Sequence, residues 1–163
     1  MVCKEDEILL GMKKRGFGEG LWNGFGGKVE EGETILEAAK RELEEEVGMV
    51  SQELLLLGIL VFTFANEPKE LEVHVFKTTV FTGEPIESEE MKPCWFLYDN
   101  IPFFDMWVSD AVWFPALLEG KQFSGRFHFD APSTPTHRAQ ILSHEFEVGN
   151  AIGRDTFGGM IAT

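Results

Sequence analysis

Residues 27–49 read GKVEEGETILEAAKRELEEEVGM, and they contain the best helical pattern in the 163-residue chain. The spacing predicts an amphipathic helix over residues 33–47, with an apolar face formed by Leu36, Ala39, Leu43 and Val47. Thr34, followed three residues later by Glu37, is typical of a capped helix start. Gly48 stands where a left-handed glycine ends a helix. The stretch therefore predicts a single helix with defined ends, preceded by a loop.

Three carboxylates crowd one face of this predicted helix. Glu42, Glu45 and Glu46 stand at positions i, i+3 and i+4, a spacing at which like charges repel and weaken a helix. A solvated acidic surface is the ordinary explanation of such a run. Two features favour a binding site instead. The opposite apolar face anchors the helix, and residues 13–27, with six glycines, precede it at close range.

The carboxylate cluster indicates a metal centre. Clustered carboxylates are the hard oxygen ligands that Mg²⁺ takes beside substrate phosphates and water. A bound metal would neutralise phosphates and lower the pKa of an attacking water. Arg41 can hold the carboxylates in place through bidentate hydrogen bonds. Gly26 and Gly27 allow the backbone to approach a metal or a phosphate closely.

The charge of the whole chain narrows the class of partner. With 28 acidic and 14 basic residues the net charge is −14, which disfavours nucleic acid as a partner. A small anionic substrate would also be repelled unless metal ions bridged it to the protein.

Cys3 and Cys94 match no metal-binding spacing and indicate a reducing compartment. The acidic N-terminus does not resemble a signal peptide, and the apolar run at residues 54–64 is shorter than the ~18 residues of a membrane helix. We therefore expect no membrane partner.

The rest of the chain alternates between strand-like runs and turns. Strands are expected at residues 8–12, 54–64, 73–82, 93–97, 123–129 and 141–148. A second helix is expected over residues 106–118, which Pro115 can interrupt. This mixture predicts the α/β class, with a sheet packed between helices. Residues 1–148 are expected to form one domain, and residues 149–163 a flexible tail.

Residues 27–49 also resemble a known motif, the Nudix box, G-x5-E-x7-R-E-U-x-E-E-x-G-U, where U is aliphatic. Every fixed position matches: Gly27, Glu33, Arg41, Glu42, Leu43, Glu45, Glu46, Gly48 and Met49. The resemblance implies an α/β/α sandwich with a mixed β-sheet and a pyrophosphohydrolase activity. It also implies that Mg²⁺ or Mn²⁺ is bound by the Gly26 carbonyl and the three glutamates, one of which lies near the attacking water. Arg41 then belongs with these glutamates among the catalytic residues.

The flanks of the box resemble the animal MutT homologues, a branch of this family that hydrolyses oxidised purine nucleoside triphosphates. Residues 9–18, 22–28, 73–76, 93–96 and 101–107 carry this resemblance, which spans about residues 4–130. It implies hydrolysis of 8-oxo-dGTP and 2-oxo-dATP to the monophosphate plus pyrophosphate. Trp107 would stack on the base, Asn23 would bind its edge, and Glu90 would be a further metal ligand. The full predicted substrate site is Lys13, Phe17, Asn23, Phe25, Gly26, Gly27, Lys28, Phe62, Trp107, Ser109 and Asp110.

Each of these residues also has an ordinary structural explanation. Phe17, Phe62 and Trp107 alone would be packing residues. Asn23 alone would be a turn residue, and Glu90 lies in an acidic run that is typical of a solvated loop. Only their joint match favours a substrate site.

Departures from the family pattern leave three interpretations of the chain open. The first strand, before residue 4, is expected to be missing, which would expose a sheet edge. The family's adjacent aspartates after the stacking tryptophan are here Ser109 and Asp110, and serine cannot change its charge. The chain is therefore either an active enzyme, a diverged domain that binds nucleotide with weak or no turnover, or a Nudix enzyme for another nucleotide. We expect a cytoplasmic monomer, with mitochondrial or nuclear nucleotide pools as other locations.

Overall fold

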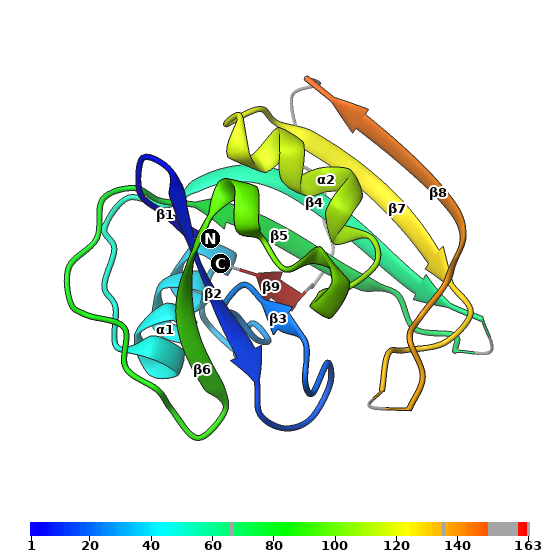
Figure 1. The fold of residues 1–163 in the computed structure, drawn as a ribbon, viewed down its shortest axis with the longest axis horizontal. Helices are drawn as coiled ribbons and strands as arrows, with labels where there is room; N and C mark the ends of the chain where they lie inside the picture. The colour runs from blue at the N-terminus through cyan, green and yellow to red at the C-terminus, as the bar shows by residue number, and fades with distance from the viewer. Residues whose placement is uncertain (66, 135, 150–159, 163) are drawn as a thin grey trace.

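The computed structural model describes residues 1–65, 67–134, 136–149 and 160–162 (Figure 1). The elements run β1 (Val2–Cys3), β2 (Glu7–Lys13), β3 (Trp22–Asn23), α1 (Ile35–Val47), β4 (Leu55–Phe64), β5 (Leu71–Lys77), β6 (Met91–Leu97), α2 (Asp110–Leu118), β7 (Phe123–Phe129), β8 (Ile141–Val148) and β9 (Met160–Ala162). Two short 3-10 turns, Tyr98–Asn100 and Phe103–Asp105, connect β6 to α2.

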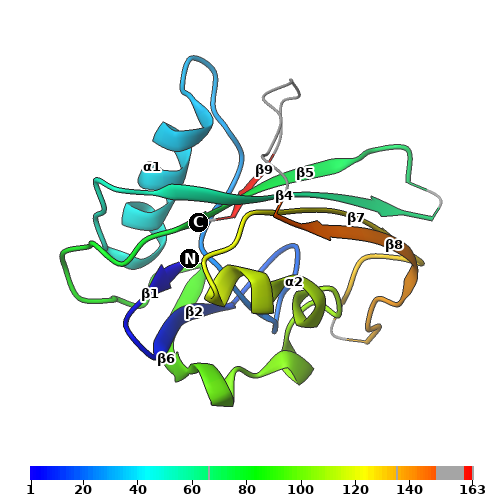
Figure 2. The same ribbon diagram turned by 90° about the horizontal axis from the view of Figure 1, so that it is seen from above.

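The strands form two sheets. In the smaller sheet β2 pairs antiparallel with β1, β3 and β6. The larger sheet has the order β8-β7-β4-β5-β9 and is mixed, because β4 pairs parallel with β7 and β5 pairs parallel with β9. Figure 2 shows α1 on one side of the larger sheet and α2 on the other, together with the smaller sheet. The predicted class, a mixed sheet between helices, is confirmed, although the strands divide between two sheets.

Helix α1 has the ends that its sequence predicts. The Thr34 Oγ1 accepts a hydrogen bond from the Glu37 N–H (3.2 Å), and the Glu37 carboxylate accepts one from the Thr34 N–H (2.7 Å). Gly48 adopts φ 72° and ends the helix. The predicted apolar face is wrong at one position, because the Leu36 side chain is exposed and Ala38 is buried instead. The helix approaches the larger sheet through its two alanines, which cluster with Phe76 of β5.

Strand β2 separates two parts of the core. Successive side chains of a strand point to opposite faces. Ile8 and Leu10 accordingly pack into the large cluster with β4, β7 and α2, whereas Leu9 packs against α1. Both faces of β2 are therefore buried, and the strand fixes the position of α1 relative to α2.

The expectation that the first strand is missing is wrong for residues 2–3. They form β1, which pairs with β2, and the Cys3 N–H donates to the Thr78 carbonyl (2.9 Å). Met1, Val2 and Cys3 are all at most 1% exposed. Three residues thus cover the sheet edge, because β1 bridges β2 and the end of β5.

The largest differences from the predicted boundaries are in β5 and α2. Strand β5 spans Leu71–Lys77 rather than residues 73–82, because Thr78 turns the chain and binds Val80 N–H and C=O through its hydroxyl. Helix α2 begins at Asp110, not at residue 106, and Pro115 lies within it without ending it.

The Lys77 ammonium donates to the Leu117 and Leu118 carbonyls and so satisfies the last turn of α2. Lys77 is therefore the cap of a helix distant in sequence.

Most of the predicted tail, residues 150–159 and 163, lies outside the described residues. Within this predicted tail, Met160–Ala162 forms β9, which pairs with β5. Residues 141–148 form the predicted edge strand β8.

No helix in the described part of the chain is long and apolar enough to cross a membrane. Both Cys3 and Cys94 are free thiols.

Candidate active site

A cavity of about 970 Å³ lies between the two sheets, and residues from both sheets, α1 and the segment before α2 line it. One end is aromatic and the other is acidic. The predicted site residues therefore come from distant parts of the chain to one place.

The aromatic end is built by alternation along two neighbouring strands. Leu60, Phe62 and Phe64 of β4 line the cavity, as do Leu71, Val73 and Val75 of β5. Trp107 faces them from the segment before α2 and stacks on Phe17, with ring centroids 5.0 Å apart and an interplanar angle of 26°. The flat rings make this end suitable for a planar, largely apolar group.

The polar side chains that line the same cavity include Asn23, Ser109 and Asp110. The Asn23 side-chain amide donates to the Leu21 carbonyl (2.9 Å), which orients it. The Ser109 hydroxyl is buried beside the Asp110 carboxyl. Burial raises the pKa of the Asp110 carboxyl to about 8, against the opposing effect of the Trp113 indole N–H, which donates to it (3.1 Å). At neutral pH the site thus offers both donors and acceptors.

The raised pKa of Asp110 predicts a pH-dependent stability. Between its ordinary value of 3.8 and about 8, the folded chain keeps the Asp110 proton and the unfolded chain releases it. The free energy of unfolding should therefore fall as pH rises through this window, by on the order of 1 kcal/mol per pH unit at most. Asp110→Asn removes the titration, so the variant should be more stable than wild type near pH 8 and lose this advantage near pH 4.

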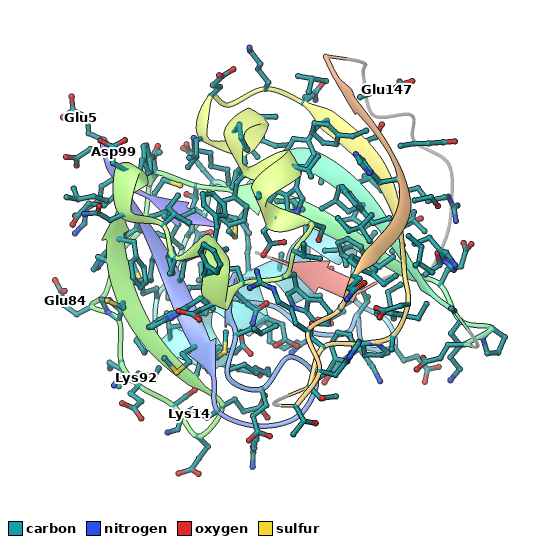
Figure 3. The ribbon with its side chains drawn as sticks, turned by 45° about the vertical axis from the view of Figure 1, so that its right-hand side comes forward. Glu5, Lys14, Glu84, Lys92, Asp99 and Glu147 are labelled. Carbon is teal, nitrogen blue, oxygen red and sulfur yellow. The ribbon has the colours of Figure 1, made fainter. Side chains whose placement is uncertain are left out.

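Urea denaturation at several pH values measures this difference. Asp99→Asn is the matched control, because Asp99 is exposed on the molecular surface (Figure 3). If Asp110→Asn and wild type differ by a constant amount from pH 4 to pH 8, the buried carboxyl is not protonated in the folded chain.

Arg41 organises the acidic end. Its guanidinium binds Glu33 through two hydrogen bonds (2.6 and 3.1 Å) and the Lys28 carbonyl (3.1 Å). The same group also donates to Glu42 (2.9 Å) and Glu45 (3.2 Å). Glu33, on the loop before α1, thus anchors the arginine, and the arginine holds two carboxylates of the helix. The pKa of Arg41 is raised by these carboxylates, Glu33 first.

Lys13 holds the other two carboxylates of this end. Its ammonium lies 3.2 Å from a Glu46 oxygen and 3.1 Å from a Glu90 oxygen. The second Glu46 oxygen accepts the Gly26 N–H (2.9 Å). Burial raises the pKa of Glu46, and Lys13 and Gly26 offset this only in part. Burial also opposes the charge of Lys13, but Glu46 and Glu90 outweigh it and raise the Lys13 pKa.

Two glycines are required where the loop meets these carboxylates. Gly26 adopts φ 153°, a conformation that side chains disfavour. A Cβ at Gly27 would fall on the Glu42 carboxylate. The close approach of the loop to α1 therefore depends on both residues, as the sequence indicates.

The acidic end fits a divalent cation by the chemistry of its donors. Glu42, Glu45, Glu46 and Glu90 are hard oxygen ligands gathered on one cavity wall. Among the described residues, however, no three His, Cys, Asp or Glu side chains are arranged around one point. Arg41 and Lys13 divide the four glutamates into two pairs, so the donors are present but occupied by cations of the chain.

The structure brings nearly all of the predicted site residues to the cavity. Lys13, Phe17, Asn23, Gly26, Gly27, Lys28, Arg41, Glu42, Glu45, Glu46, Phe62, Glu90, Trp107, Ser109 and Asp110 line it. Phe25 does not: it is fully buried in the cluster with Leu9 and Leu43 and acts as a packing residue. The reason is alternation, because the neighbouring Gly24 and Gly26 line the cavity and Phe25 points away from it.

Several lining residues were missed. Phe64 and Phe129 complete the aromatic end, and Arg15 binds the outer Glu90 oxygen (3.0 Å). Phe64 was detectable, because it follows Phe62 at the two-residue period of a strand. Arg15 was not, since its contact joins residues 75 positions apart.

Comparison with known proteins gives consistent matches. The NUDIX domain family matches residues 1–117. The mouse oxidized purine nucleoside triphosphate hydrolase is 52% identical over 134 residues, which cover 82% of this chain and 86% of the mouse protein. The zebrafish (Danio rerio) protein of the same name is 51% identical and covers 79% of this chain and 83% of its own. A crystal structure of the MutT protein from Bacillus halodurans matches with a TM-score of 0.77 and 31% identity, over 90% of this chain and 94% of that one.

Proposed function

We propose that this chain, which belongs to the NUDIX domain family of hydrolases, hydrolyses oxidised purine nucleoside triphosphates to the monophosphate plus pyrophosphate. The proposed substrates are 8-oxo-dGTP and 2-oxo-dATP. One observation carries the proposal: the same cavity has an aromatic end, which polar side chains also line, and an acidic end. The names of the mouse and zebrafish relatives support the same substrate class.

The family uses a divalent metal, and we propose Mg²⁺, with Mn²⁺ as a substitute. Glu42, Glu45 and Glu46 would hold it, together with Glu90 and the Gly26 carbonyl. When bound, the metal neutralises phosphate charge and lowers the pKa of the attacking water. It also overcomes the repulsion between a triphosphate and a chain of net charge −14.

The chain's own residues would bind and orient the nucleotide. The Trp107 ring would stack on the purine, and Phe17 and Phe62 would exclude water from it. Asn23, Ser109 and Asp110 would bind the base edge, since a side-chain amide, a hydroxyl and a neutral carboxyl can each donate and accept. Lys13 and Lys28 would face the phosphates, and Gly27 would let the backbone approach them.

Arg41 would act as a positioning residue. It contacts Glu42 and Glu45 but is itself fixed by Glu33 and the Lys28 carbonyl. Arg41 would therefore hold the carboxylates of Glu42 and Glu45, two proposed metal ligands, in place without touching the substrate. Glu46 would serve as a ligand and as the carboxylate nearest the attacking water.

Initial rates with 8-oxo-dGTP, 2-oxo-dATP and dGTP test the proposed substrate class. We expect kcat/KM for the oxidised purines to exceed that for dGTP by about tenfold or more, because a buried polar site discriminates by hydrogen bonds. Equal kcat/KM values would assign the chain to another nucleotide. If 8-oxo-dGTP raises the melting temperature of the protein but no product forms, the chain is a domain that binds the nucleotide without turnover.

The remaining proposals concern the setting of the enzyme. We propose that it acts as a monomer on small-molecule nucleotides in the cytoplasm or in mitochondrial or nuclear pools, with no nucleic-acid or membrane partner. We further propose that residues 1–148 form the catalytic domain.

A further inference from the structure

Lys13 occupies the position between two proposed metal ligands. Within the described part of the chain, the hydrogen bonds of its ammonium go to Glu46 of α1 and to Glu90, which lies just before β6. The Lys13 side chain is 19% exposed and that of Glu46 is 7% exposed. A positive charge thus sits where carboxylates from two distant segments meet.

Arg41 differs from Lys13 in how it is held. Its bonds to Glu33 and to the Lys28 carbonyl do not involve the proposed metal ligands. Arg41 would keep its place if Glu42 and Glu45 turned toward a metal. Lys13 would lose both of its partners if Glu46 and Glu90 did so.

Lys13 and a metal ion would compete for the same two carboxylates. A divalent ion bound by Glu46 and Glu90 would take the oxygen atoms that Lys13 now contacts and would lie within a few ångströms of a like charge, which is unfavourable in a partly buried site. Among the described residues, no three such side chains are arranged to hold a metal ion while Lys13 keeps these contacts.

We propose that Lys13 is a tethered counter-ion of the metal-free site, and that metal binding requires its release from Glu46 and Glu90. This inference rests on the metal site of the proposed function. In the metal-free chain Lys13 neutralises carboxylates that would otherwise repel one another. On release, the ammonium stays on the cavity wall, and the competition lowers the affinity for metal in the absence of nucleotide.

Mn²⁺ binding without nucleotide, measured by electron paramagnetic resonance, tests the competition. Lys13→Met removes the competing charge and keeps most of the side-chain volume. We expect Lys13→Met to bind Mn²⁺ about tenfold more tightly than wild type. The free energy of one hydrogen bond to a charged group is large enough to change a dissociation constant by about that factor.

Two further variants separate competition from general charge effects. Lys14→Met makes the same change in net charge at the outer edge of the molecule, where Lys14 pairs with Glu87 (Figure 3), and should bind Mn²⁺ as wild type does. Lys13→Arg keeps the charge and should also match wild type. The inference is overturned if Lys13→Met binds Mn²⁺ no more tightly than wild type, or if Lys14→Met tightens binding equally.

The melting temperature of the metal-free protein is a second readout. Without metal, the melting temperature of Lys13→Met should lie below that of wild type, because its carboxylates lack their counter-ion. Adding Mn²⁺ should raise the melting temperature of Lys13→Met by more than it raises that of wild type. A metal-free variant as stable as wild type would contradict the counter-ion role. Neither measurement uses hydrolysis, so an inactive chain that shows these shifts would refute the proposed function and leave this inference intact.

Discussion

Glu46→Gln should lower kcat for 8-oxo-dGTP by a factor of about 10³, the range expected when a carboxylate that positions or activates the attacking water is lost. Glu46 is the buried carboxylate of the acidic end, and it contacts both the Gly26 N–H and Lys13. Glutamine preserves the shape and can still accept from Gly26. The variant therefore removes the charge while keeping the loop against α1.

The fold should survive this change. Burial already disfavours the charged form of Glu46, so the melting temperature of Glu46→Gln should equal or exceed that of wild type. Glu44→Gln is the matched control, because Glu44 lies exposed on the same helix and does not line the cavity. If Glu46→Gln retains more than about a tenth of wild-type kcat while Glu44→Gln is normal, Glu46 has no such role.

Trp107→Leu should have the second largest effect, mainly on KM. Stacking of a base on an aromatic ring contributes about 1–3 kcal/mol, which corresponds to a rise in KM of roughly 10- to 100-fold. Leucine keeps an apolar contact with Phe129 but offers no flat face. Steady-state kinetics with 8-oxo-dGTP, and binding of a non-hydrolysable analogue, measure the loss.

Trp95→Leu controls for the loss of a large ring. Trp95 packs beside Phe81 and under the Lys4 ammonium, and it does not line the cavity. Its replacement should lower stability but leave KM unchanged. Similar KM values for wild type and Trp107→Leu would show that the purine does not stack on Trp107.

Local patterns predicted helix α1 well. The pair Thr34 and Glu37 and the glycine at position 48 act within a few residues of α1, so its ends are readable from the sequence. That Glu42, Glu45 and Glu46 lie on the cavity side of α1 follows from helical spacing alone. Their connection to Arg41 was also predictable, because Arg41 is their neighbour on the same helix.

The errors arise where tertiary contacts decide the outcome. Phe25 and Phe62 look alike in sequence, yet Phe25 lies in the core and Phe62 on the cavity wall. The pairing of β1 with β2, and that of β9 with β5, joins segments whose own patterns are too short to indicate a strand. The bridge from Lys13 to Glu46 and Glu90 spans 33 and 77 residues, so it was visible only in the folded chain.

We propose that the acidic and aromatic ends of one cavity make this chain a metal-dependent pyrophosphohydrolase of oxidised purine nucleotides. Separation of the products formed from 8-oxo-dGTP tests it most directly. We predict equal amounts of 8-oxo-dGMP and pyrophosphate when Mg²⁺ is present, and no product when it is chelated. Release of 8-oxo-dGDP and inorganic phosphate, product without a divalent metal, or no product at all would contradict the claim.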